Sequence, residues 1–531
     1  MDQINNEPQA AFNKHKIDAV IIGAGALGSF YAAQLAQQGK TVVVLEAGPA
    51  WSTADLYSSQ IWARRLKWRG APVLSEGKNP LSHNLSMGSG LGGAALHHFG
   101  TWPRFTEETF ELKSRYGESR NWPFSYDTLR PFYDRIQDDV GIAGDHTAEP
   151  WRPSSKPYPM PGHKLFRQAQ LLQKGFESIG KSVAPLPVII NSTVYKGRPP
   201  CMYDGWCEAG CPIGALNNPL VSYLPLAQKH GAIFRSNCTV TRILMNKKIA
   251  SGVEYIENGE RKIQLADVVI LASSFIQTPR LLLNSRTAQF PNGLANRSGL
   301  VGQELEIDVL APIYGLFAEN TEAHMGVNAG QLMHRSMYKE KDRAHLLGNY
   351  QWQIAPSMKP NDLLGVANTR VDLFGRRLHE FMQHASSHIA TMAGFGGSPA
   401  TKTNRISLSE KTDANGLPLA RLEHTFSPRA LQMYEHLVKE GTSVMRAAGA
   451  KEIWNGRPVS GHICGGTIMG KNPRDSVCDS YGRAHDIPNL IISGAGLLPA
   501  GSGFSPTFTL HALALRSSEH LLTHWQDYAR G

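Results

Sequence analysis

The chain has 531 residues and a formal net charge of +10, with 41% hydrophobic and 18% charged residues. This length predicts two or more domains in an ordinary globular protein. No apolar run is long enough to span a bilayer, the first fifteen residues lack an apolar signal core, and the Lys and Arg residues are scattered, so we expect no transmembrane segment and no nucleic-acid binding.

The stretch 18–48 has the pattern of a strand, a glycine turn, a helix and a second strand. An apolar run precedes Gly23, Gly25 and Gly28, and a β-branched run ends at Glu46. The first glycine permits the tight turn, the second lets the backbone approach a pyrophosphate, and the third lets the helix pack on its strand. We expect the Glu46 carboxylate to accept the ribose hydroxyls of an adenosine. The complete unit favours a dinucleotide site over a structural glycine turn.

A second glycine-rich segment, 87–93, runs into apolar and aromatic residues that extend to Phe105. Gly88, Gly92 and Gly93 allow backbone N–H groups to approach an anion or an aromatic ring without interference from side chains. The flanking apolar residues favour a packed loop over a flexible surface loop.

Three cysteines with the spacing C-x5-C-x3-C lie in the loop 201–214. Cys201, Cys207 and Cys211 can hold an iron–sulfur cluster, because thiolates are the ligands that this chemistry requires. Three cysteines rather than four favour a 3Fe-4S cluster, with one thiolate per iron. A structural disulfide with a spare thiol is the alternative, and a zinc site would need a fourth ligand that no nearby histidine supplies.

These motifs, with a histidine motif near the C-terminus, resemble the glucose-methanol-choline (GMC) family of flavoprotein oxidoreductases. Gly92-Gly93-x-x-x-His97 and the cysteine loop resemble one branch of it, the large subunits of bacterial glucose, glucoside, gluconate and fructose dehydrogenases. The resemblance implies an α/β GMC fold: a Rossmann-like FAD-binding domain and a discontinuous α+β substrate-binding domain with an antiparallel sheet. It also implies FAD, either joined covalently to His97 or packed near that histidine.

The same resemblance implies further cofactor contacts. In the family one strand lays its backbone against the adenine ring, which places Val240 there, and the turn Ala272–Ser273 approaches the ribose and phosphates. The segment around Ala495 reaches the pyrimidine edge of the flavin. The final helix starts near Thr507 and directs its positive N-terminus at the ring.

The stretch 461–470 resembles the family motif H-x-x-G-T-x-x-M-G, although Gly466 stands where the family has threonine. The histidine of this motif, His462, would take the hydroxyl proton while a hydride leaves for flavin N5. Ser505 stands where relatives carry histidine or asparagine. A serine hydroxyl can still hydrogen-bond the substrate oxygen.

From these motifs we predict alternating segments of two domains. They are a flexible tail at 1–15, FAD-binding parts at 16–106, 199–305 and 461–531, and substrate-domain parts at 107–198 and 306–460. Within the last of these, the pattern predicts strands near 309–317 and 419–425 and a helix near 428–448.

We therefore predict an FAD-dependent dehydrogenase that oxidises C1 or C3 of a glucose-type sugar or glycoside and passes electrons through the cluster to a cytochrome c or a quinone. The resemblance implies a small signal-bearing partner subunit and a periplasmic location, with the cytoplasm as the alternative. Three rival interpretations stay open: an oxygen-using oxidase with structural cysteines, a non-catalytic electron-transfer or scaffold subunit, suggested by Ser505, and an NAD-binding protein.

Overall fold

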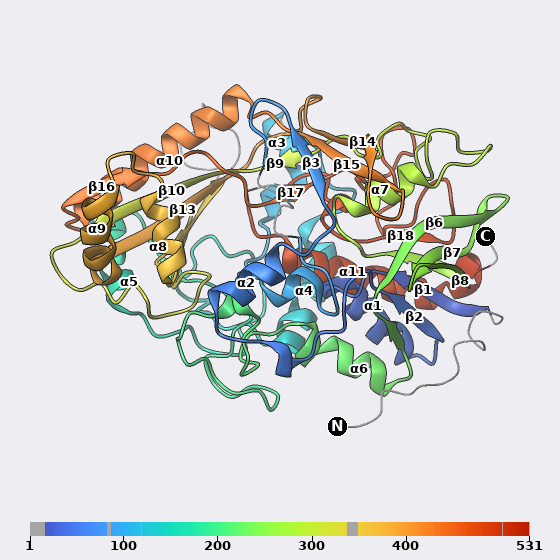
Figure 1. The fold of residues 1–531 in the computed structure, drawn as a ribbon, viewed down its shortest axis with the longest axis horizontal. Coiled ribbons are helices and arrows are strands. Elements are labelled where there is room, and N and C mark those ends of the chain that lie inside the picture. Colours follow the sequence, from blue (N-terminus) through green and yellow to red (C-terminus); the bar gives the residue numbers. More distant parts are fainter. Residues whose placement is uncertain (1–15, 82–86, 118, 337–348, 502, 530–531) are drawn as a thin grey trace.

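The computed structural model describes residues 16–81, 87–117, 119–336, 349–501 and 503–529. Its strands form two main sheets, which lie in different halves of the molecule (Figure 1). Two smaller sheets lie between them in the view of Figure 1.

The first main sheet has seven strands in the order β5-β2-β1-β8-β7-β6, with β18 paired to β8. Its members are β1 (Ile17–Ile22), β2 (Val42–Leu45), β5 (Ile233–Arg235), β6 (Cys238–Asn246), β7 (Ile249–Glu257), β8 (Glu260–Leu271) and β18 (Leu490–Ile492). β5, β2, β1, β8 and β18 are parallel, whereas β7 and β6 are antiparallel. β1 and β2 are almost completely buried, as central strands of a parallel sheet require.

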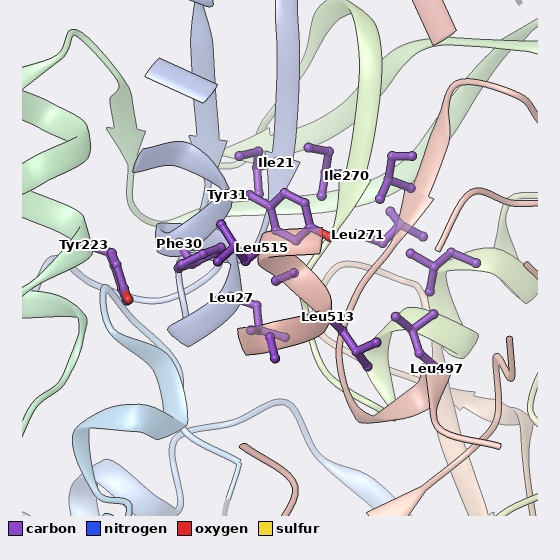
Figure 2. Packing of buried hydrophobic residues seen from close by; sticks show 14 of the residues in the cluster. Ile21, Leu27, Phe30, Tyr31, Tyr223, Ile270, Leu271, Leu497, Leu513 and Leu515 are labelled. Carbon is purple, nitrogen blue, oxygen red and sulfur yellow. The ribbon is translucent and has the colours of Figure 1, made fainter. Parts of the chain in front are cut away.

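Helix α1, which follows β1, is the centre of the first core. Nearly all of its residues are buried, because it is apolar on every side. Figure 2 shows Leu27, Phe30 and Tyr31 of α1 beside Leu513 and Leu515 of α11. The helices of this half are α1 (Ala26–Ala36), α4 (Tyr126–Val140), α6 (Tyr223–Lys229), α11 (Thr507–Thr523) and α12 (Trp525–Ala529).

The second main sheet has six antiparallel strands in the order β16-β10-β13-β12-β11-β4. They are β4 (Ala184–Pro185), β10 (Val309–Leu316), β11 (Leu332–Arg335), β12 (Tyr350–Ile354), β13 (Ile389–Gly396) and β16 (Glu452–Asn455). α5 (Arg167–Ser178) and α10 (Pro428–Ala447) pack on one face of this sheet and form the second core. α8 (Pro360–Ala367) and α9 (Gly375–His388) pack together at its β10–β16 end (Figure 1).

The smaller sheets join segments that are far apart in the sequence. The hairpin of β14 (Arg405–Thr412) and β15 (Pro418–Glu423) pairs with β3 (Val73–Glu76), and β17 (Ile463–Cys464) pairs with β9 (Glu306–Ile307). The remaining helices are α2 (Gln60–Lys67), α3 (Leu112–Tyr116) and α7 (Gln277–Asn284).

This architecture confirms the predicted fold class, a parallel Rossmann-like sheet combined with a separate antiparallel sheet. β10, β15 and α10 match the three elements predicted between 306 and 460. The domain boundaries stay predictions, because the β14–β15 hairpin belongs to the predicted substrate segment but packs against α7 of the FAD-binding part. Among the described residues, no helix combines the length and the apolar character needed to cross a membrane.

Candidate active site and cofactor cavity

A cavity of about 940 Å³ lies beside the turn between β1 and α1. This volume is near the upper end of small-molecule sites. Ten of the residues predicted to bind the cofactor line it. They are Gly23, Gly25, Glu46, Gly88, Gly93, Val240, Ala272, Ser273, Ala495 and Thr507.

The glycines of the first turn shape one wall of the cavity. A Cβ on Gly28 would lie 1.8 Å from the carbonyl oxygen of Gly23, so Gly28 lets α1 approach the turn although it does not line the cavity. A Cβ on Gly25 would meet only the Cα of Gly93, at 3.9 Å. The backbone at Gly25 therefore stays open to the cavity at the N-terminus of α1, which is the cradle that a dinucleotide pyrophosphate requires.

Glu46 holds three segments of this wall together. Its carboxylate accepts the backbone N–H groups of Ala24, Gly48 and Gly90 at 2.8–2.9 Å. Burial raises the pKa of Glu46, and these hydrogen bonds oppose that rise. The bonds occupy most of the roughly four acceptor positions of a carboxylate. Its role at the ribose stays a prediction, and the observed role is to join the turn to the glycine loop.

Two other predicted residues of the glycine loop lie away from the cavity lining. Gly92 and His97 are not among the described residues that line it, whereas His98 is. The ring nitrogens of His98 contact the carbonyl oxygen of Asn217 at 2.9 Å and the backbone N–H of Gly100 at 3.2 Å. Burial lowers the pKa of His98 to about 4, so this imidazole is neutral at physiological pH.

His462 lines the cavity in a fixed orientation. β17 pairs Ile463 with Ile307 of β9, which brings His462 beside Asp308. Nδ1 of His462 lies 2.9 Å from Oδ2 of Asp308, whose side chain is fully buried. Oδ1 of Asp308 accepts the hydroxyl of Ser460 and the backbone N–H groups of Gly461 and His462.

The other ring nitrogen of His462 is turned toward the second predicted catalytic residue. Its Nε2 lies 3.3 Å from Oγ of Ser505, which also accepts a hydrogen bond from Nε2 of Gln353 at 3.4 Å. Because Asp308 accepts the Nδ1 proton, Nε2 carries the free lone pair of a neutral imidazole. The arrangement can therefore take a proton at Nε2, and Asp308 can stabilise the imidazolium that results.

Sequence reasoning missed Asp308 and Gln353. Asp308 lies between the apolar residues Ile307 and Val309, and a carboxylate inside an apolar run is costly to bury unless it has partners. That position was a usable signal. Gln353 had no signal, because its role depends on the neighbouring strands of the sheet.

The predicted cluster ligands all lie in the loop 201–214, and none of them is among the described residues that line the cavity. Cys201, Cys207 and Cys211 are free thiols, and each sulfur accepts a backbone N–H group at 3.3–3.5 Å. Burial raises the pKa of all three thiols, that of Cys201 to about 11. Three sulfur ligands with N–H donors fit the thiolates of an iron–sulfur cluster, whose sulfurs are commonly hydrogen-bonded.

The described residues contain no group of three or more His, Cys, Asp or Glu side chains that could hold a single metal ion. Two lysines fix the loop: Lys67 of α2 forms an ion pair with Glu208, and Lys359 donates to the carbonyl oxygen of Asp204.

The family models described as "GMC oxidoreductase" match residues 17–309 and 399–514. The chain is 27% identical to the fructose dehydrogenase large subunit of Gluconobacter japonicus, over 95% of this chain and 97% of that protein. It is 27% identical to the 2-methyl-1,2-propanediol dehydrogenase of Mycolicibacterium austroafricanum, over 96% of each. It is 25% identical to the gluconate 2-dehydrogenase flavoprotein of Pantoea cypripedii, over 95% and 93%. The solved structure of a pyridoxine 4-oxidase has the same fold, with a TM-score of 0.68 at 15% identity over 96% of this chain and 100% of that one.

Proposed function

Since the chain belongs to the GMC oxidoreductase family, whose members are FAD enzymes that act on CH–OH groups, we propose that it is a dehydrogenase of a sugar or glycoside. The observation that carries the proposal is the buried Asp308 that orients His462 in the wall of the cavity. FAD, when bound, accepts the hydride from the alcohol carbon.

The residues of this chain handle the proton. Nε2 of His462 takes it from the substrate hydroxyl, and the Asp308 carboxylate stabilises the imidazolium. Oγ of Ser505 hydrogen-bonds the substrate oxygen and keeps it beside Nε2. Gly25 and the N-terminus of α1 hold the pyrophosphate of the cofactor.

The substrate class rests on the relatives and on the predicted motifs. Two of the relatives are named for a sugar or a sugar acid, fructose and gluconate, and a third is named for a small diol. We infer oxidation at C1 or C3 of a glucose-type ring. Two alternatives for FAD belong to the same proposal, a covalent bond to His97 or non-covalent packing near this histidine. Acid precipitation distinguishes them, because a covalent flavin stays with the protein pellet.

The narrower resemblance adds an electron relay. Cys201, Cys207 and Cys211 would hold a 3Fe-4S cluster, which supplies one-electron transfer to a cytochrome c or a quinone. Their shared loop and the N–H donors at each sulfur support this assignment. A small partner subunit and a periplasmic location belong to the same proposal, supported by the relative named as a large subunit. Co-purification of a second, smaller chain from the native source tests the partner.

The test of the function is anaerobic reduction of the bound flavin. We expect glucose or a glucoside to bleach the yellow protein, a dye acceptor to restore the colour, and air to yield little peroxide. His462→Gln should keep the FAD and lose about 10²–10⁴-fold in the rate of bleaching, the usual contribution of a general base. Rapid peroxide formation would favour an oxidase. Absence of bleaching by every sugar and alcohol would refute the proposal.

A further inference from the structure

One face of the six-stranded sheet carries polar side chains that no step above uses. Arg335 of β11 lies opposite Gln351 of β12, and Gln351 lies opposite Phe395 of β13. Directly opposite residues of an antiparallel sheet point to the same face, and Gln353 shares that face because it lies two positions from Gln351. We call these four residues the roof face. The opposite face packs on α5 and α10.

The roof face lies over the catalytic pair. The ring of Phe395 is 5.3 Å from the ring of His462, and Gln353 donates to the hydroxyl of Ser505. Alternate residues of a strand are about 6.8 Å apart, so the pair of Arg335 and Gln351 lies about 7 Å along the sheet from the contact with Ser505. None of the four roof-face residues is among the described residues that line the cavity, so a substrate held at His462 and Ser505 would extend beyond that lining to reach Arg335.

Several buried polar atoms of this region have no hydrogen-bond partner among the described residues. They include both amide atoms of Gln351 and of Asn349, and Nε and Nη2 of Arg335. These three side chains are at most 3% exposed. Buried polar groups are nearly always satisfied by protein, water or a ligand, so this cluster beside the catalytic pair is a place where a polar ligand can replace water.

The free atoms of Arg335 form one edge of its guanidinium group. Nη1 donates to the carbonyl oxygen of Arg104 at 2.7 Å, and the guanidinium carbon lies 3.8 Å from the ring centre of Phe504, which precedes Ser505. The Nε–H group and the adjacent Nη2–H group have no hydrogen-bond partner among the described residues. These two parallel N–H groups match the two oxygens of a carboxylate, which Arg binds through two hydrogen bonds.

The charges around Arg335 leave room for an anion. Among the acidic residues, Glu149 has the strongest electrostatic effect on Arg335. Its carboxyl group, however, accepts a hydrogen bond from the hydroxyl of Tyr158. Burial also raises the pKa of Glu149 to about 7, so this group is only partly ionised at neutral pH. The neighbouring Arg104 has its own partner, Asp134, at 2.6 Å. Among the described residues, no carboxylate forms an ion pair with Arg335, although Glu149 and Glu108 lie near enough to act on its charge.

We infer that the substrate carries a carboxylate, which binds the Nε and Nη2 edge of Arg335 while Gln351 binds its neighbouring hydroxyls. The preferred substrate is then an acidic member of the sugar series, such as a uronic or aldonic acid, over the neutral sugar. This inference rests on the proposed function, because it names the substrate of that same site. Arg335 is a specificity residue that does not touch the reacting atoms.

The test compares matched substrates with the holoenzyme under anaerobic conditions and a dye acceptor. The probes are glucose, glucuronate, gluconate and glucose 6-phosphate. We expect kcat/KM for one of the two acids to exceed that for glucose at least tenfold. Arg335→Met should lower kcat/KM for that acid by at least about 50-fold, as loss of one partner of a buried ion pair does, and change the value for glucose less than about threefold.

Two further variants separate recognition from folding. Arg335→Lys keeps the charge but loses the paired N–H groups, so it should lose about tenfold on the acid even if Arg335→Met folds poorly. Arg376→Met removes an arginine whose side chain is 91% exposed and should match the wild type. Gluconate and glucuronate should also raise the melting temperature of the wild type, and not that of Arg335→Met.

Preference for glucose with equal losses on all probes in Arg335→Met would overturn the inference and leave the proposed function standing. Preference for glucose 6-phosphate would overturn the carboxylate assignment. If no probe reduces the flavin, the proposed function fails, and the melting-temperature comparison still decides whether Arg335 binds a carboxylate. Equal shifts in both proteins would then refute the inference.

Discussion

The most informative single residue of the catalytic site is Asp308. Its carboxylate is fully buried and accepts four hydrogen bonds, all from the segment 460–462. Such an acid is costly to bury unless its partners are in place, so the contacts fix both the backbone of this segment and the ring of His462. The orientation of the base is therefore a property of Asp308 as much as of His462.

Replacing Asp308 with asparagine tests this role. An amide at this position cannot stabilise an imidazolium and can turn the ring of His462, so we expect kcat to fall about 10²–10⁴-fold with FAD still bound. The measurement is steady-state oxidation with a dye acceptor, together with the FAD content. Asp127→Asn is the control, because that side chain is 76% exposed and forms only a surface ion pair with Arg130. Activity within threefold of the wild type in Asp308→Asn would contradict the assignment.

At the scale of elements, the turn between β1 and α1 separates two functions of glycine. Gly28 permits close packing, since an added Cβ would overlap the carbonyl oxygen of Gly23, whereas Gly25 keeps the cavity wall open. Gly25 has φ −73°, a value that alanine adopts without strain. Substitution at the two positions should therefore affect different properties of the protein.

We expect Gly25→Ala to fold normally and to bind FAD at least about tenfold more weakly, because the methyl group stands where the pyrophosphate approaches. Gly28→Ala should instead destabilise the fold by about 3 kcal/mol or more, through overpacking and displacement of α1. Thermal melting of the apoprotein and titration with FAD distinguish the two effects. A Gly25→Ala protein with unchanged FAD affinity would show that the cofactor does not approach this turn.

The elements with strong local patterns could be predicted from the sequence. The unit 18–48, β10 and α10 have runs or periods that specify their type, and the structure contains them. The strand expected to carry Val240 is β6, and a separate short strand, β5, precedes it; the two are divided at Asn237, which has φ +55°. Asparagine tolerates this left-handed conformation, and the sequence alone did not indicate that the chain would use it.

The candidate site was predictable only where one segment carries the signal. His462 and Ser505 stand in motifs, and the structure brings them within 3.3 Å of each other. The contributions of Asp308, Gln353 and Arg335 depend on which strands pair and which face each side chain takes. Sheet register is set by long-range packing, so no local pattern announces these contacts.

At the scale of the whole molecule, stability should depend on pH through a buried histidine. His511 of α11 is 3% exposed and lines the cavity, and burial lowers its pKa to about 4. Its folded pKa is below the unfolded value of about 6.5, so the unfolded chain binds more protons between these values. Stability from this group is complete above about pH 6.5 and is lost as the pH falls through about 4.

At pH 4 the free energy of unfolding has lost roughly 3 kcal/mol through His511, because each unit of pKa difference between the folded and unfolded states corresponds to about 1.4 kcal/mol. Glu149 acts in the opposite direction, because its raised pKa of about 7 adds stability below the unfolded value that is lost as the pH rises through 7. The difference between variants isolates the histidine. The free energy of unfolding, measured by denaturant titration, should fall less steeply in His511→Gln than in the wild type as the pH goes from 6.5 to 4. Equal slopes would contradict this account.

The cysteine loop lies between the surface and the cavity, so the proposed relay would carry electrons from the cofactor cavity to the surface. Met202 is 69% exposed, Cys207 is buried, and Asn218 lines the cavity. The segment from 201 to 218 thus extends from solvent to the cofactor site. An electron carrier held in this loop would therefore be close to an external acceptor at the surface.

Cys207→Ser is the sharpest test of that relay, because a hydroxyl is a poor ligand for the iron of such a cluster. We expect the variant to lose iron and sulfide, to keep its FAD, and to be bleached by substrate at the wild-type rate. Transfer to cytochrome c should fall at least about tenfold, because the flavin then has no one-electron intermediary. Cys238→Ser, at a buried cysteine outside the loop, should keep both iron and transfer. Wild-type protein prepared without oxygen that contains neither iron nor sulfide would exclude the cluster and leave the dehydrogenase proposal to rest on His462 and Asp308.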